Sequence, residues 1–169
     1  MQGERPDRGF YDPEMIAESC GLVRVMCYDK HLASQPGHGP TSTAPWAREA
    51  VSSWLRYVPR EKLVMGLPAY SNDYDLRPGK RGRQVYASRP DVRDQTELEK
   101  HWRPFEQIHV YRYLESEGHP RVFFASDAKS NTAHLETVEK LDLGGFGFWH
   151  YGSVSPEMWQ TVQTATEKR

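Results

Sequence analysis

The sequence has few cysteines, no long apolar run and no strong excess of charge of either sign. Its two cysteines in 169 residues are too few for a disulfide framework or a zinc site. Lysine and arginine number 22 against 23 aspartates and glutamates, so no strong field favours nucleic acid or an anionic membrane as a partner. No apolar run approaches the roughly 20 residues that span a bilayer. The first residues lack the apolar core of a signal peptide, and the compartment of the protein is left open.

Aromatic residues are frequent instead, at 12% of the chain, and the order of apolar runs predicts an α/β fold. The predicted strands lack a clean alternation of apolar and polar residues, which is typical of a parallel sheet covered on both faces. Cys27 lies inside one such strand, so we expect a buried free thiol. Strands are predicted over 22–28, 62–67, 84–88, 121–125 and 145–149. Helices are predicted over 12–18, 44–55, 130–141 and 156–164, the third of them capped by Asp127. Residues 96–114 are predicted to form a helix followed by a strand, and residues 71–82 are polar and turn-rich.

Aromatic and acidic side chains gather where three of the predicted strands end. The first strand leads into Tyr28, Asp29 and His31, the second into Tyr70 and a run of polar residues, and the third into Trp149. Because ligands bind at the carboxyl ends of strands in parallel β/α folds, one interpretation is a binding cleft. The other is that these aromatic side chains only close the end of the sheet, and the residues alone favour neither. His31 and His38 have no third residue at the spacing of metal ligands, so we interpret them as surface or cleft-lining.

Four segments resemble the end of the catalytic domain of glycoside hydrolase family 18, the chitinase group. Met26-Cys27-Tyr28-Asp29 is similar to the Met-x-Tyr-Asp signature of that family's sixth strand. Residues 62–70, Lys-Leu-Val-Met-Gly-Leu-Pro-Ala-Tyr, resemble its seventh strand, and residues 145–149, Gly-Phe-Gly-Phe-Trp, resemble its eighth. Residues 122–130 resemble the apolar run, with an Asp and a Ser, that precedes the last helix.

The resemblance implies a partial (β/α)8 TIM barrel made of the sixth to eighth strand units. Residues 1–169 would be the C-terminal part of one barrel domain. Residues 71–121 would form a small α+β insertion between the seventh and eighth strands.

The same resemblance implies a cleft for N-acetylated sugars. In that family the N-acetyl oxygen of the substrate attacks the anomeric carbon, and a glutamic acid protonates the leaving oxygen. By position, Tyr28 would donate its hydroxyl to the N-acetyl oxygen, and Asp29 would line the same subsite and tune the acid. Met26 would pack beside the sugar, Trp149 would form the floor, and Tyr70 would lie at the rim. The resemblance implies no metal and no cofactor.

The chain departs from the family in one respect that bears on activity. The family's acid lies in an Asp-x-x-Asp-x-Asp-x-Glu motif on the fourth strand, and no such string occurs in this sequence. Residues 91–97 come nearest, but their spacing differs and they lie outside any apolar strand.

We therefore expect a fragment of a glycosidase that is inactive alone. Its glycan would contain N-acetylglucosamine, whether chitin-like, peptidoglycan-derived or an N-glycan. Two alternatives stay open. One is a non-catalytic carbohydrate-binding module. The other is a half-barrel that pairs with the missing N-terminal half or with itself through an open sheet edge.

Overall fold

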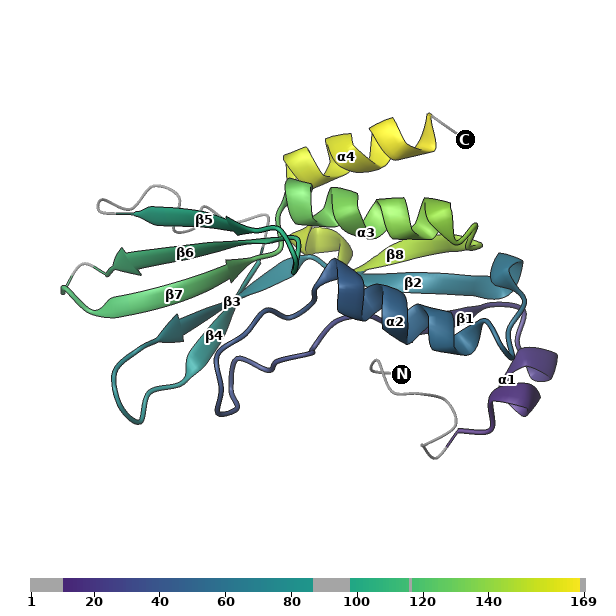
Figure 1. Ribbon diagram of the computed structural model, residues 1–169, viewed down its shortest axis with the longest axis horizontal. Coiled ribbons are helices and arrows are strands. Elements are labelled where there is room, and N and C mark those ends of the chain that lie inside the picture. The colour runs from purple at the N-terminus through teal and green to yellow at the C-terminus, as the bar shows by residue number, and fades with distance from the viewer. Residues whose placement is uncertain (1–10, 87–97, 116, 168–169) are drawn as a thin grey trace.

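The computed structural model describes residues 11–86, 98–115 and 117–167 of the chain. Figure 1 shows two sheets joined end to end, one covered by helices and the other projecting away from them. The elements in chain order are α1 (Pro13–Ser19), β1 (Val23–Met26), α2 (Ala44–Trp54), the 3-10 helix η2 (Arg60–Lys62), β2 (Leu63–Pro68), β3 (Tyr70–Asp75), β4 (Gly82–Tyr86), β5 (Glu99–Arg103), β6 (Ile108–Leu114), β7 (Pro120–Ala125), α3 (Ala128–Lys140), β8 (Gly145–Trp149), the 3-10 helix η4 (Tyr151–Ser153) and α4 (Pro156–Thr166). No helix in these ranges is long and apolar enough to cross a membrane.

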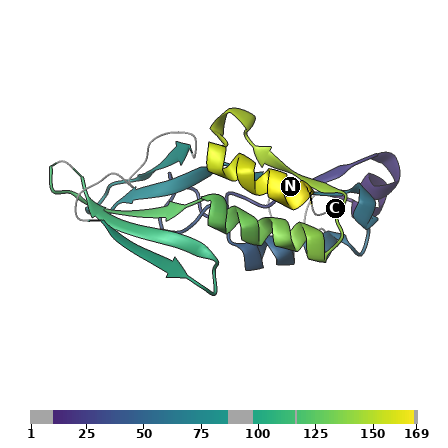
Figure 2. The same cartoon turned by 90° about the horizontal axis from the view of Figure 1, so that it is seen from above.

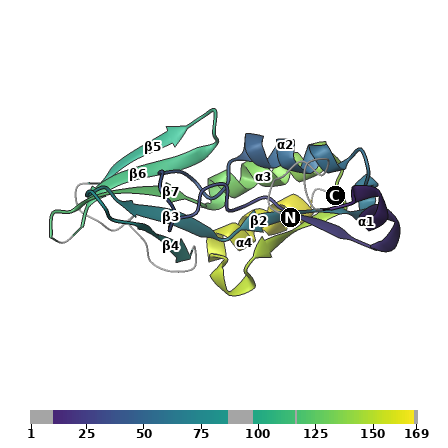
Figure 3. The same cartoon turned by 90° about the horizontal axis from the view of Figure 1, so that it is seen from below.

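The first sheet is parallel and has the strand order β1-β2-β8. Since side chains alternate along a strand, Leu63, Met65 and Leu67 point to one face of β2, where they join the main hydrophobic core with Val51 and Trp54 of α2. Helix α3 packs beside α2, and α4 packs beside α3, as Figure 3 shows from below. Helices therefore cover one face of this sheet in the described part of the chain.

The helices begin where the sequence provides caps. The Asp12 side chain accepts a hydrogen bond from Met15 N, and Pro13 follows at the first turn. Asp127 and Ser130 exchange side-chain-to-backbone hydrogen bonds as a capping box at the start of α3, which confirms the predicted cap. Ser155 caps α4 in the same way through Met158 N.

The second sheet is antiparallel and has the strand order β4-β3-β7-β6-β5. It projects beyond the helices when the molecule is seen from above (Figure 2). One of its faces buries Tyr74, Val110 and Phe124. The opposite face buries Tyr111 and Phe123.

Several sequence predictions are confirmed and two are wrong. The parallel strands, the α/β class and the four isolated helices lie where predicted, and Cys27 is a buried free thiol whose pKa burial raises to about 12. The turn-rich segment predicted over 71–82 is confined to residues 76–81, because β3 occupies Tyr70–Asp75 and is buried along its whole length. The helix predicted at the start of 96–114 is also wrong, since β5 pairs with β6 there as an antiparallel hairpin.

The expected α+β insertion over 71–121 thus contains only strands in its described residues, and the antiparallel sheet extends from Tyr70 to Ala125. The described strands form no closed barrel.

Candidate functional site

Tyr28 and Asp29 lie directly beyond the carboxyl end of β1, and the loop that follows fixes their backbone. Asp29 has a positive φ of 61°, a conformation that Asp adopts more readily than most residues. Its N–H donates to the Thr41 hydroxyl over 3.1 Å, and Lys30 N–H donates to the Thr41 carbonyl over 2.9 Å. Thr41 is buried, so these two bonds hold the turn from inside the loop.

Tyr70, at the start of β3, meets Asp29 directly. The Tyr70 hydroxyl donates a short hydrogen bond to Asp29 Oδ1. The Tyr28 and Tyr70 rings stand edge to face, with centroids 6.3 Å apart. Burial, followed by the hydrogen bond to Asp29, raises the pKa of Tyr70, and burial raises the pKa of Tyr28. Both phenols therefore stay protonated and can donate hydrogen bonds at neutral pH.

Met26 lies in a row with two glycines on the face of the parallel sheet opposite the helices. It pairs with Gly66 of β2, which pairs with Gly147 of β8. A Cβ at Gly66 would lie 2.9 Å from Val25 O and 3.3 Å from Tyr28 Cε1, so glycine is needed to leave room for the Tyr28 ring.

Arg24 covers the far end of that row. Its guanidinium would lie 3.1 Å from a Cβ placed at Gly147, so it reaches across β2 toward β8. Arg24 also acts on Tyr28, whose pKa it lowers against the larger effect of burial. Arg24 was not among the predicted site residues, although its alternation with Met26 along β1 puts the two side chains on the same face.

Trp149 ends β8 and is 54% exposed. Its carbonyl accepts a hydrogen bond from Ala69 N over 2.8 Å, which ties the end of β8 to the chain entering β3. The Trp149 ring lies 6.2 Å from that of His150. Of the predicted site residues, Tyr28, Asp29 and Tyr70 thus lie together, Met26 ends β1 two residues before Tyr28, and Trp149 lies at the end of β8, with β2 between β1 and β8.

The histidines near this site have structural partners. His31 Nδ1 lies 3.0 Å from the Pro40 carbonyl, and the His38 ring lies 4.8 Å from that of Tyr74. Among the residues that the structure describes, no group of three or more His, Cys, Asp or Glu could hold a metal ion. The segment 91–97 lies outside the described residues.

A groove of about 450 Å³ lies elsewhere, between α3 and α4. Leu135, Val138 and Phe146 form its apolar base, and Glu139 and Gln160 are among its polar residues. It shares no lining residue with the contacts around Asp29, so it has no part in the chemistry of that site.

The profile of the family described as "Glycosyl hydrolases family 18" matches residues 1–153. The chain belongs to glycosyl hydrolase family 18. The match lies in the C-terminal part of the family's domain, which agrees with the strands that carried the resemblance in the sequence.

This family 18 chain is similar to two proteins of Bacillus subtilis and to a solved chitinase structure, each at less than 25% identity. The glycosylase YvbX of Bacillus subtilis is 22% identical over 167 residues, which cover 93% of this chain and 46% of that protein. The cortical fragment-lytic enzyme of the same organism is 24% identical over 153 residues, covering 88% of this chain and 35% of the enzyme. The crystal structure of a chitinase from Chromobacterium violaceum superposes with a TM-score of 0.78 at 19% identity, over 94% of this chain and 50% of that one. The chain therefore shares the α/β fold of that chitinase, and it spans less than half the length of the two curated relatives.

Proposed function

We propose that this family 18 chain forms the sugar-holding side of a glycosidase that acts on glycans containing N-acetylglucosamine. The contact between Tyr70 and Asp29, beside Tyr28, is the observation that carries the proposal. A phenol hydroxyl and a carboxylate meet there beside a second tyrosine ring, which suits the polar groups and the apolar faces of a sugar. Relatives are named as a chitinase and as a cortical fragment-lytic enzyme, so chitin-like and peptidoglycan-derived chains are the first candidates, with N-glycans after them.

The proposed chemistry is substrate-assisted hydrolysis. The substrate's N-acetyl oxygen attacks the anomeric carbon, and the Tyr28 hydroxyl donates a hydrogen bond to that oxygen. Asp29 lines the same subsite, and its carboxylate accepts the hydrogen bond from the Tyr70 hydroxyl. Met26 packs beside the sugar, and the exposed Trp149 ring offers an apolar face as the floor.

The proton donor of the reaction comes from outside this sequence. No Asp-x-x-Asp-x-Asp-x-Glu string occurs among its 169 residues. We expect the chain alone to bind sugar and to leave glycosidic bonds intact, measured as no release of product from a chromogenic chito-oligosaccharide. Hydrolysis by the purified chain would contradict this assignment.

We assign β1, β2 and β8 to the sixth, seventh and eighth strands of a (β/α)8 barrel, and the antiparallel sheet to an insertion between the last two. The parallel order β1-β2-β8 and the TM-score of 0.78 support the assignment. Within the described residues β1 and β8 each pair with β2 alone, so both outer edges of the parallel sheet present unpaired backbone groups.

These open edges favour a second candidate, a half-barrel that pairs with another polypeptide or with a second copy. Light scattering on the purified chain tests self-pairing. A monodisperse monomer would rule out obligate association of two copies, whereas a dimer that Pro substitution in β8 dissociates would support it.

Replacing Trp149 by alanine is expected to weaken binding of N-acetylglucosamine oligomers about tenfold or more, because the exposed ring supplies the apolar floor of the subsite. The measurement is isothermal titration of the chain with tetra-N-acetylchitotetraose. Trp159→Ala is the matched control, since Trp159 lies on α4 against Phe148 and Tyr151. A folded chain that binds no oligomer, or equal losses in both variants, would contradict the proposal.

Replacing Tyr70 by phenylalanine removes the hydroxyl that donates to Asp29 and keeps the ring beside Tyr28. We expect sugar affinity to fall about three- to tenfold, because the Asp29 carboxylate loses the group that orients it. Tyr113→Phe serves as the control, since Tyr113 donates a comparable hydrogen bond to Asp73 in the antiparallel sheet. That variant should lose stability and keep its affinity. Unchanged binding by Tyr70→Phe would argue against a role for the pair.

A further inference from the structure

The last described residue of β4, Tyr86, lies next to the proposed sugar site. It pairs with Tyr70 in the antiparallel register of β3 and β4. Side chains of directly paired residues point to the same face of a sheet, so Tyr86 and Tyr70 share a face. Tyr86 is 36% exposed, whereas Tyr70 is buried. The edge strand of the antiparallel sheet thus carries a solvent-accessible aromatic ring on the side of the site.

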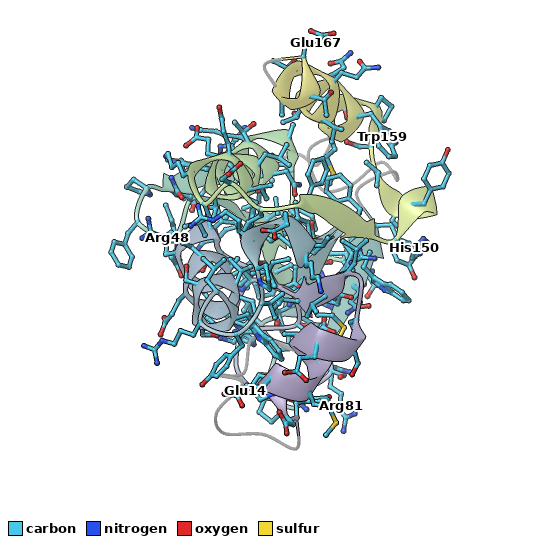
Figure 4. The ribbon with its side chains drawn as sticks, turned by 90° about the vertical axis from the view of Figure 1, so that its right-hand side faces the viewer. Glu14, Arg48, Arg81, His150, Trp159 and Glu167 are labelled. Carbon is cyan, nitrogen blue, oxygen red and sulfur yellow. The ribbon has the colours of Figure 1, made fainter. Side chains whose placement is uncertain are left out.

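A ring contact joins Tyr86 to the end of β8. The Tyr86 and His150 rings are 5.4 Å apart at an interplanar angle of 64°, and the His150 and Trp149 rings are 6.2 Å apart at 88°. The hydroxyl of the buried Ser153 lies 2.9 Å from His150 Nε2. The imidazole is therefore held between Ser153 and Tyr86 while the residue stays exposed. Figure 4 shows His150 at the margin of the molecule, on the same side as Trp159 and away from Arg48.

We infer that Tyr86 and His150 form a further binding site for a glycan, which holds the sugar unit adjacent to the one on Trp149. The inference rests on the proposed function of the Trp149 site. A single N-acetylglucosamine would contact Trp149 alone, whereas a longer chain would extend across β8 to the edge strand of the antiparallel sheet.

The chemistry of the three rings favours a sugar over an apolar protein surface. Each ring combines an apolar face with a polar edge, in the phenol hydroxyl, the imidazole nitrogens or the indole N–H. A pyranose ring likewise has apolar C–H faces and a rim of hydroxyl groups. An apolar protein partner would bury the polar edges without hydrogen bonds, which costs free energy.

The test compares the dependence of affinity on oligomer length. The full chain is titrated with N-acetylglucosamine and with its oligomers of increasing length, from the monosaccharide to the hexasaccharide. Wild-type affinity should rise with length, and Tyr86→Ala and His150→Ala should each cut affinity for the hexasaccharide about fivefold while changing affinity for the monosaccharide less than twofold. Tyr86→Trp keeps an aromatic face and should retain the wild-type gain. The control Phe105→Ala removes an aromatic that is 85% exposed beside β5, at the opposite edge of the sheet from β4.

The outcomes separate this site from the proposed function. Binding of every oligomer by Tyr86→Ala and His150→Ala with wild-type affinity would overturn the further site and leave the Trp149 site standing. Equal losses for the monosaccharide and the hexasaccharide would also overturn it, because the two residues would then belong to the first subsite. No binding of any oligomer by the folded wild-type chain would overturn both proposals.

Discussion

Replacing Asp73 by alanine is expected to lower the free energy of unfolding by about 3–5 kcal/mol, because it removes the carboxylate in closest contact with a buried guanidinium. The Asp73 side chain is fully buried in the antiparallel sheet. It accepts hydrogen bonds from Arg121 Nη2, from the Tyr113 hydroxyl and from Arg83 Nε, each over 2.9 Å. Arg121 is itself buried, and in the variant its nearest carboxylates are Glu115 at 3.5 Å and Asp75 at 3.8 Å. Urea denaturation followed by circular dichroism measures the loss.

Two further variants separate this charge effect from a general loss of packing. Glu115 also contacts Arg121, over 3.5 Å, but its side chain is 33% exposed, so Glu115→Ala should cost about 1 kcal/mol or less. The double variant Asp73→Leu/Arg121→Met removes both buried charges and should be more stable than Asp73→Ala. If Asp73→Ala lowered the free energy of unfolding no more than Glu115→Ala does, the prediction that the buried network stabilises the fold by several kcal/mol would be wrong.

This network also explains why β3 could not be recognised from the sequence. Its residues Tyr-Ser-Asn-Asp-Tyr-Asp are polar and typical of a turn, yet every one of them is buried. The partner that neutralises Asp73 lies 48 positions along the chain, at Arg121, and hydropathy does not record pairing over that distance. Asn72 is held in the same way, since its amide donates to the His31 and Gly39 carbonyls.

The error at β5 has a different cause. Glu99-Lys100-His101-Trp102-Arg103 has the charged residues of a helix, and its propensity for a strand is low. Pairing with β6 overrides that propensity, and the hairpin gains from Lys129 lying 3.9 Å over the Trp102 ring and from Lys100 over Tyr111. By contrast, the parallel strands and their helices were predictable because their apolar runs and caps are local signals.

Some residues of the candidate site were likewise predictable from local signals, and others were not. Tyr28 and Asp29 follow an apolar strand directly, and Tyr70 follows the next one, so the rule that ligands bind at the carboxyl ends of parallel strands was enough to group them. Thr41 and Tyr86 were missed, because each reaches the site through a loop or an edge strand whose course the sequence does not define. Asp73 links the antiparallel sheet to the site, because it holds β3 within that sheet and β3 begins at Tyr70.

The stability of the protein is expected to fall as the pH drops from 6.5 toward 4, because His134 is buried in its neutral form. Its Nδ1–H donates to the Ser130 carbonyl over 2.8 Å, which leaves Nε2 to accept from the Ser42 hydroxyl over 3.0 Å. Burial lowers the pKa of His134 from 6.5 to about 4. Between these values the unfolded chain binds a proton that the folded chain does not, so the free energy of unfolding rises with pH. The contribution of His134 is complete above pH 6.5, and about 3 kcal/mol of it is lost on acidification to pH 4.

The measurement is the free energy of unfolding at pH 7, 5.5 and 4 in the wild type and in His134→Gln. The variant is expected to be less stable at pH 7, because the hydrogen bonds to Ser42 and Ser130 change. Its loss between pH 7 and pH 4 should nevertheless be smaller than that of the wild type by about 3 kcal/mol. Equal losses in the two proteins would assign the acid sensitivity to other groups.

The bond to Ser42 also joins α3 to the loop in which Thr41 holds Asp29, so acidification should loosen the sugar site before the chain unfolds globally. Titration of wild type with the tetrasaccharide at pH 5.5, still above the folded pKa of His134, should therefore give an affinity close to that at pH 7, and the affinity should fall as the pH approaches 4.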